Sequence, residues 1–139
     1  MTMRTRDATV SRRHGGTVKG VGVERMFRAF SDRTRLRILH LLEDHREVCV
    51  GDLVAVLAAP QTTVSRHLAY LRRSGLVQVR KDGLWKHYSL AAPASRLHRA
   101  LLRCLPWCFE EVRELAADRK SFERLKGCCS TMVGPRRLD

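Results

Sequence analysis

Hydrophobic residues recur every three or four positions through the first half of the chain, which is the period of an amphipathic helix. The pattern predicts four helices, at about residues 23–30, 31–43, 50–58 and 61–73. Ser31 is the expected N-cap of the second helix, because its hydroxyl can accept a hydrogen bond from a free backbone N–H.

The hydrophobic period changes from helical to alternating after Gly75, where we expect a left-handed helix C-cap. Residues 76–80 and 84–90 alternate with period two on either side of the expected turn at residues 81–83. That turn contains an Asp-Gly pair, and such a pair between two alternating runs predicts a β-hairpin.

Helical spacing returns after Pro93, and Pro106 interrupts it. Proline removes a backbone hydrogen bond from a helix, so we expect two helices, at about 94–105 and 106–125. The order α-α-α-α-β-β-α(-α) predicts a mainly α-helical chain with a small β-hairpin. This is a winged helix-turn-helix, in which the third and fourth helices form the helix-turn-helix and the hairpin is the wing.

The composition divides the chain into four expected segments. They are a basic N-terminal arm without hydrophobic periodicity at 1–20, a winged helix-turn-helix domain at 21–92, C-terminal helices at 93–127 and a tail with adjacent cysteines at 128–139.

The charge balance narrows the function classes. The chain has 139 residues, enough for one domain, with 27 Lys plus Arg against 14 Asp plus Glu and a net charge of +13. Residues 60–90 hold six of the basic residues and only Asp82 as an acid. Such a basic patch is the electrostatic footprint of a nucleic-acid-binding protein. No apolar run approaches the roughly 20 residues of a membrane span, and the first residues lack the apolar stretch of a secretory signal. We therefore expect a cytoplasmic protein.

The fourth helix turns short polar and basic side chains away from the core, because Val64, Leu68 and Leu71 are spaced to face inward. A recognition helix presents its N-terminal residues to base edges in the major groove, and Arg suits guanine or phosphate. The candidate DNA-binding residues are Gln61, Thr62, Thr63, Ser65, Arg66, His67, Tyr70, Arg72 and Arg73 of the helix, with Arg80, Lys81 and Lys86 of the hairpin. The alternative is an ordinary solvated face, and for His67 and His87 a hydrogen bond to DNA competes with plain solvation.

The chain resembles the ArsR/SmtB family of bacterial winged-helix repressors. The resemblance rests on Ala29–Leu42, Val48–Leu53, Thr63–Val77 and Arg80–Leu90, about half of the chain. It implies a cytoplasmic homodimer that binds double-stranded DNA at an imperfect inverted repeat and is released by a metal or metalloid. It also implies dimer contacts from the first and last helices.

Five cysteines are the candidate ligands of the inducer. They are Cys49, Cys104, Cys108, Cys128 and Cys129. Arsenical members of the family often carry a thiol at the position of Cys49 and two more at the positions of Gly51 and Val54, which this chain lacks. The adjacent pair Cys128 and Cys129 suits a soft trivalent ion such as As(III) or Sb(III), because thiolates are soft ligands. The third thiol can come from Cys49, Cys104 or Cys108, of the same chain or of the partner chain, and the alternative for each of these is core packing.

Zinc is the rival inducer, since zinc sites use Cys, His, Asp and Glu. The zinc-sensing members of the family use an Asp two residues before a His on the helix after the wing. Here Arg96 stands before His98, so we expect His98 at the surface or in a dimer contact.

The sequence therefore predicts a repressor of an arsenical-resistance operon, released by As(III), Sb(III) or methylarsenite. A thiol-redox or zinc/cadmium-responsive repressor of the same fold is the first alternative. A ligand-independent architectural DNA-binding protein is another. We do not expect an enzyme, because the chain has no Cys-x-x-Cys motif and no nucleophile paired with a base in a suitable strand-turn context.

Overall fold

The computed structural model describes residues 22–125, apart from the side chains of residues 108–110. The expected arm at 1–20, the tail at 128–139 and the side chain of Cys108 therefore lie outside the described part of the chain. The elements are α2 (Val23–Phe30), α3 (Arg33–Asp44), β1 (Val48–Cys49), α4 (Val50–Leu57), α5 (Gln61–Arg73), β2 (Val77–Asp82), β3 (Trp85–Leu90), α6 (Arg96–Glu111) and α7 (Arg113–Arg124). This order confirms the mainly α-helical winged helix-turn-helix, with β1 as an additional element.

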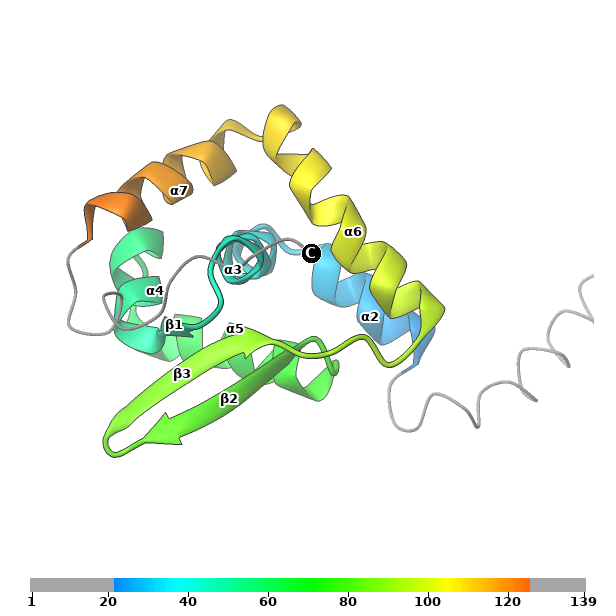
Figure 1. Ribbon diagram of the computed structural model, residues 1–139, viewed down its shortest axis with the longest axis horizontal. Coiled ribbons are helices and arrows are strands. Elements are labelled where there is room, and N and C mark those ends of the chain that lie inside the picture. The colour runs from blue at the N-terminus through cyan, green and yellow to red at the C-terminus, as the bar shows by residue number, and fades with distance from the viewer. Residues whose placement is uncertain (1–21, 126–139) are drawn as a thin grey trace, which may run out of the picture.

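Helix α3 occupies the centre of the molecule, and the other elements surround it (Figure 1). Its residues 38–42 are buried in succession, so this helix is covered on every side rather than on a single stripe. A helix that is buried all round is a core helix. It packs against α2, α4, α5, α6, α7 and β3.

The start of α3 differs from the expectation. Asp32, not Ser31, is its N-cap, and the Asp32 carboxylate accepts a hydrogen bond from the Arg35 backbone N–H at 3.0 Å. Ser31 instead ends α2, where its hydroxyl donates to the carbonyl oxygen of Arg28 at 2.8 Å. Both residue types cap helices. The hydroxyl is already used by the preceding helix, so the next residue along the chain supplies the cap.

The end of α5 confirms the expected left-handed C-cap. Gly75 has φ +77°, a region that glycine occupies without steric cost. The Leu76 N–H donates to the Leu71 carbonyl and the Gly75 N–H donates to the Arg72 carbonyl, both at 3.0 Å, which is the Schellman pattern. This ending turns the chain directly from α5 into β2.

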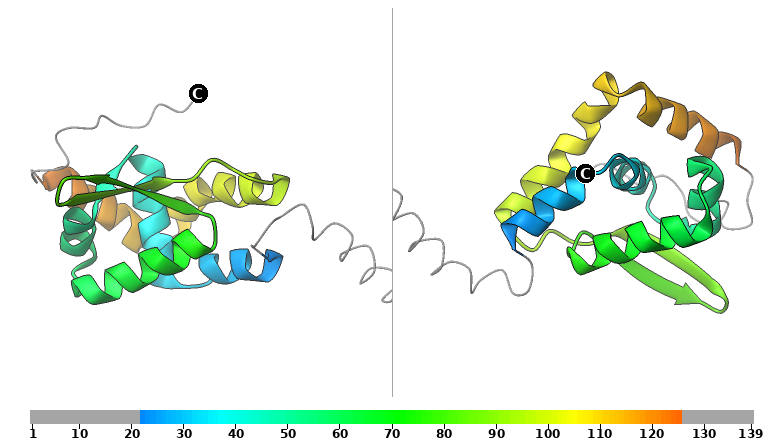
Figure 2. Two further views of the ribbon diagram at one scale, coloured as in Figure 1. Left: turned by 90° about the horizontal axis from the view of Figure 1, so that it is seen from below. Right: turned by 180° about the vertical axis from the view of Figure 1, so that it is seen from behind.

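The sheet has three antiparallel strands in the order β1-β3-β2. The hairpin connection is the pair Gly83-Leu84 rather than residues 81–83, so Lys81 and Asp82 belong to β2. Gly83 has φ +61° and Leu84 does not have a positive φ, the pattern of a type II′ turn. The shift places Leu84 at the apex of the hairpin, which extends away from the helices (Figures 1 and 2).

The break between the two C-terminal helices is also displaced. Helix α6 continues through Pro106 and ends at Glu111, and Val112, with extended φ and ψ, separates it from α7. The apolar face of α6 continues up to the buried Leu105, directly before the proline. Burial of this face compensates the hydrogen bond that Pro106 cannot make, which costs about 3 kcal/mol in a helix interior.

Helix α7 docks on α3 and α4 of its own chain. Arg37 of α3 binds the buried Asp118 through two hydrogen bonds, of 2.7 and 2.8 Å, and lies 3.3 Å from Glu114. This pairing raises the pKa of Arg37, chiefly through the Asp118 hydrogen bonds. At the far end of α7, the Phe122 ring lies 4.0 Å from the ring of His45. The last helix is thus part of the core of the protomer.

Two histidines are buried, and the burial of His98 corrects the expectation that it lies at the surface or in a dimer contact. His98 is almost fully buried, and its Nδ1 accepts a hydrogen bond from the Ala94 backbone N–H at 3.1 Å. Burial lowers the pKa of His98. His40 is buried in α3, and burial, with smaller effects of Arg119 and His45, lowers its pKa to about 3.

Loss of the buried Asp118 carboxylate should strongly destabilise the fold. We expect Asp118→Ala to lower the free energy of unfolding by about 2–3 kcal/mol, because the mostly covered Arg37 guanidinium loses both hydrogen bonds to Asp118 and keeps only Glu114, at 3.3 Å. Arg33→Gln is the matched control, since the exposed Arg33–Glu114 pair joins the same two helices and should be worth under about 1 kcal/mol. Urea unfolding followed by circular dichroism measures both. Equal losses in the two variants would contradict this ranking.

The fold should lose stability on acidification through His40. A His whose folded-state pKa is lowered takes up its proton in the unfolded state first, so stability is complete above about pH 6.5 and falls as the pH drops toward 3. Between pH 7.5 and 5 this group removes at most about 2 kcal/mol, and His98 acts in the same direction. His40→Leu should flatten the dependence, measured as the urea midpoint at both pH values. A variant that keeps the full wild-type slope refutes the role of His40.

Candidate nucleic-acid interface

Helix α5 presents one exposed polar face, as its sequence predicts. Val64, Leu68 and Leu71 are fully buried and anchor the opposite face. The exposed predicted residues are Gln61, Thr62, Ser65, Arg66, Arg72 and Arg73. None of the side chains described caps the start of this helix. The N–H groups of Thr63 and Val64 donate to the Pro60 carbonyl, and the positive end of the helix dipole lies at this end of α5, beside the exposed polar side chains.

Three other predicted residues lie at the border between α5 and the rest of the protein. Thr63, His67 and Tyr70 are half-buried. His67 Nδ1 lies 3.8 Å from the carboxylate of Asp32, and the guanidinium of Arg35 stacks on the Tyr70 ring at 4.2 Å. The same Arg35 side chain donates to carbonyl groups of α2 at 2.7 and 3.1 Å. These contacts fix the orientation of α5 on α3.

The three predicted cations of the hairpin differ in their surroundings. Arg80 makes two hydrogen bonds to the Glu47 carboxylate, at 3.0 and 3.1 Å, and these lower the pKa of Glu47. Lys81 and Lys86 are exposed, and no carboxylate among residues 22–125 forms a salt bridge with either. The charge of Arg80 is therefore neutralised within the protein, and that of the two lysines is not.

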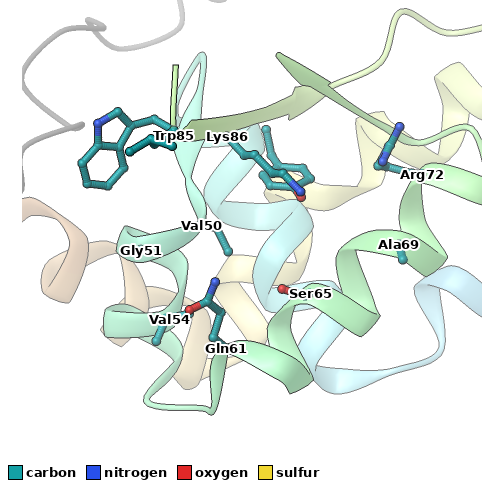
Figure 3. A pocket seen from close by; sticks show the side chains of 11 residues that line it. Val50, Gly51, Val54, Gln61, Ser65, Ala69, Arg72, Trp85 and Lys86 are labelled. Carbon is teal, nitrogen blue, oxygen red and sulfur yellow. The ribbon is translucent and has the colours of Figure 1, made fainter. Parts of the chain in front are cut away.

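A hollow of about 490 Å³ lies between α5, the start of α4 and the hairpin (Figure 3). Gln61, Ser65, Ala69 and Arg72 line it from α5. Its other walls are Val50, Gly51 and Val54 from α4, with Leu84, Trp85, Lys86 and Tyr88 from the hairpin. Polar and cationic groups thus share one concave surface with apolar ones, which suits a sugar-phosphate strand that passes between a helix and a hairpin.

Sequence reasoning missed Leu84 and Trp85. Leu84 is fully exposed and Trp85 is 49% exposed, and both border the hollow. The sequence did contain an indication of these two residues. Turns favour Gly, Asn, Asp and Ser, so two large apolar residues directly after the Asp-Gly pair are unusual.

His87 is buried beneath the hairpin, so the expectation that it faces DNA or solvent is wrong. Strand β1 covers it, with Cys49 directly opposite His87 in the ladder. The Cys49 thiol hydrogen-bonds to the Asp52 carboxyl group, which is buried; burial raises the pKa of Asp52. His87 lies near enough to Glu47 and Asp52 to lower the pKa of each. A compact polar cluster therefore joins β1, the start of α4 and the hairpin.

The cysteines are only partly placed. Cys49 is buried as the N-cap residue of α4, and Cys104 is half-buried in α6, where its thiol donates to the Leu101 carbonyl at 2.9 Å. Cys128, Cys129 and the side chain of Cys108 lie outside the described part of the chain. Within residues 22–125, no three His, Cys, Asp or Glu side chains are grouped so that they could hold a metal ion. No helix in that range could span a membrane.

The sequence of the chain is similar to that of known transcriptional regulators. Residues 32–79 match the family model described as "Bacterial regulatory protein, arsR family". An uncharacterized HTH-type transcriptional regulator of Methanocaldococcus jannaschii is 44% identical over 63 residues, which are 45% of this chain and 71% of that protein. The arsenical resistance operon repressor of Escherichia coli is 48% identical over 66 residues, which are 48% of this chain and 56% of that protein.

Solved structures agree with the fold. Reduced HlyU from Vibrio cholerae aligns with a TM-score of 0.52 and 34% identity, over 61% of this chain and 85% of that one. The aligned part includes a winged helix-turn-helix, the same arrangement that α4, α5 and the hairpin form here.

Replacement of Arg72 and replacement of Arg80 should change the salt dependence of DNA binding to different extents. Arg72 is exposed in the hollow, so we expect Arg72→Gln to reduce the slope of log K against log salt by about 0.9, the loss of one phosphate contact. Arg80→Gln should change the slope less, because Glu47 already neutralises Arg80. Fluorescence anisotropy with duplex DNA at several salt concentrations measures both slopes. A larger effect of Arg80 would contradict this division.

Proposed function

The chain belongs to the ArsR family of bacterial transcriptional regulators, and we propose that it represses an arsenical-resistance operon until As(III) or Sb(III) binds its cysteine thiolates. As a family member it is a DNA-binding transcription regulator and not an enzyme. The observation that carries the proposed inducer is the 48% identity with the arsenical resistance operon repressor. That alignment covers 56% of the relative, so the inducer, the operator and a cytoplasmic location are proposals for this chain.

The proposal assigns DNA reading to α5 and strand contact to the hairpin. Gln61, Thr62, Ser65 and Arg66 lie at the exposed start of α5, where a recognition helix meets base edges. Arg72 and Arg73, in the last turn, are placed for phosphates. The exposed charge and the hollow beside it support this assignment.

We propose a homodimer whose contacts come from α2 and α6. These helices lie along the same side of the molecule, away from the hairpin tip (Figures 1 and 2). Val23 and Phe27 of α2 and Trp107 of α6 are large apolar side chains that remain exposed there. Exposed apolar groups on a small protein mark an interaction surface. A two-fold dimer would present two copies of α5 to an inverted repeat about one DNA turn apart.

The third thiol of the proposed arsenic site is Cys49. The contact of Phe122 with His45 places the end of α7 beside the turn that leads into β1. Leu125 packs against the core, and Cys128 follows it by three residues in the sequence. Cys104 is on α6, a different element.

The positions after Cys49 support the same assignment. A Cβ at Gly51 would lie 3.8 Å from the Cys49 sulfur, so position 51 faces that thiol. Arsenical members resemble this chain at Cys49 but carry further thiols at the positions of Gly51 and Val54. With these absent, the adjacent thiols of Cys128 and Cys129 are the available soft ligands, and soft ligands suit a trivalent metalloid.

The position of Cys49 supports a route by which the proposed inducer would release DNA. β1 pairs with β3 at Val48–Tyr88 and Cys49–His87, and Cys49 also begins α4. Movement of Cys49 toward the C-terminal thiols would shift both the hairpin and α4, which border the hollow beside α5. By thermodynamic linkage, DNA must weaken inducer binding by the same factor by which the inducer weakens DNA binding.

Replacement of the thiols tests the proposed inducer site. We expect Cys128→Ser/Cys129→Ser and Cys49→Ser each to bind DNA as the wild type does but to stay bound when arsenite is added. Cys104→Ser is the matched control and should still be released. Anisotropy of labelled duplex, titrated with arsenite, antimonite, methylarsenite, zinc, cadmium and peroxide, measures release. Arsenite release of the double variant refutes the site; release by peroxide or cadmium alone favours a redox or cadmium sensor.

A further inference from the structure

We propose that the hollow beside α5 is a binding site for a small organic anion with an apolar body, such as an aromatic carboxylate, and that this ligand and DNA exclude each other. The volume of the hollow, about 490 Å³, lies within the range of small-molecule sites, which is about 300–1,000 Å³. The site uses none of the cysteine thiols. Its effect on DNA rests on the proposed function, whereas the binding of the anion does not.

The walls of the hollow are largely apolar. Val50 and Val54 line it from α4, Ala69 from α5 and Tyr88 from β3. The two valines are only half-buried and Ala69 is exposed, so apolar surface remains uncovered there. No Cys, His, Asp or Glu is among the residues that line the hollow, so it does not suit a metal ion or a soft metalloid. Apolar and aromatic walls with a few polar groups are the usual composition of a small-molecule site.

Two cations give the hollow its charge. Arg72 comes from the α5 wall and Lys86 from the hairpin wall (Figure 3). Both side chains are exposed, and no carboxylate among residues 22–125 forms a salt bridge with either. A guanidinium binds a carboxylate through charge-assisted hydrogen bonds, which are stronger than those between neutral groups. The hollow therefore suits an acidic group placed between Arg72 and Lys86.

The starts of two helices add to the positive potential. Val50 and Gly51 begin α4, Gln61 begins α5, and all three line the hollow. None of the side chains described caps either helix, and the positive end of a helix dipole favours an anion. Gln61 and Arg72 lie about 16 Å apart along α5, at 1.5 Å per residue. An acidic group bound at Arg72 leaves room for fused aromatic rings that extend toward Val54.

The same space is assigned to a DNA strand in the proposed function. An anion that binds Arg72 removes that charge from the phosphates, and its apolar body fills the gap between α5 and the hairpin. By thermodynamic linkage, DNA must weaken binding of the anion by the same factor by which the anion weakens binding of DNA. The hollow would thus receive a second class of effector, chemically unrelated to the thiol-binding inducer.

Titration of the DNA-free protein with 2-naphthoate, followed by amide NMR spectra, tests the site. We expect a Kd below about 1 mM, and binding at least tenfold weaker for the uncharged analogue 2-naphthamide. Arg72→Gln and Lys86→Gln should each weaken naphthoate binding about five- to tenfold. Ala69→Leu should abolish it, because the larger side chain fills the hollow. Arg73→Gln and Ala55→Leu are the matched controls, since both residues are exposed and neither lines the hollow.

The same spectra locate the ligand. Resonances of Ser65, Ala69 and Lys86 should shift, whereas the indole N–H of Trp107, which is exposed on α6, should not. Three results would overturn the inference: no saturable binding, equal affinity for naphthamide, or shifts confined to the surroundings of Trp107. The last of these would identify adsorption to the exposed apolar residues of α6 instead.

Exclusion of DNA is measured on the duplex that the wild-type protein selects from a pool of random-sequence DNA. Naphthoate should release this duplex from the wild type and equally from Cys128→Ser/Cys129→Ser, because the hollow contains no thiol. Ala69→Leu should stay bound to the duplex when naphthoate is added. Simultaneous binding of naphthoate and duplex overturns the exclusion. Failure of the wild type to select any duplex, with naphthoate binding intact, refutes the DNA-binding assignment and leaves the anion site standing.

Discussion

Burial of α3 on all sides is the constraint on which the remaining structure depends. Residues 38–42 have no solvent-facing side, so each neighbouring element must supply a complementary surface to a different part of this helix. Close packing of protein interiors makes such a centre intolerant of small displacements. The reading helix, the hairpin and the C-terminal helix are therefore all positioned by reference to the same twelve-residue segment.

Two arginines of α3 that lie two residues apart, and so on different faces of the helix, connect it to α5 and to α7. Arg35 stacks on Tyr70 and thereby holds the reading helix α5. Arg37 binds Asp118 and thereby holds α7, the helix after which the adjacent cysteines follow. In the proposed mechanism, inducer binding would act on α5 through α7 and α3 or through Cys49 and β1. Either path ends at elements that border the hollow.

The proposed DNA interface offers three kinds of chemical group, whose contacts with DNA would depend differently on salt. The exposed start of α5 offers hydrogen-bonding groups for bases, Arg72, Lys81 and Lys86 offer charge for phosphates, and Leu84 offers apolar surface. Charge contacts weaken steeply with salt, whereas the apolar contact does not. Arg80, which resembles the other cations in sequence, serves mainly to join the hairpin to Glu47.

Local rules of the chain were sufficient for the order of elements, the inward positions of α5 and the left-handed glycine after it, because each depends on neighbours within one or two turns. The same rules located the basic face of the helix and hairpin. They could not choose between Ser31 and Asp32 as a cap, show that helix α6 passes Pro106, or find that His87 and His98 are buried. The burial of His87 under β1 and the continuation of α6 past Pro106 depend on packing against distant segments, and the cap of α3 depends on which helix uses the Ser31 hydroxyl. Local sequence preferences for helix formation and helix ends are worth about 1–3 kcal/mol. Long-range packing or an ion pair decides the structure wherever it contributes more free energy than this.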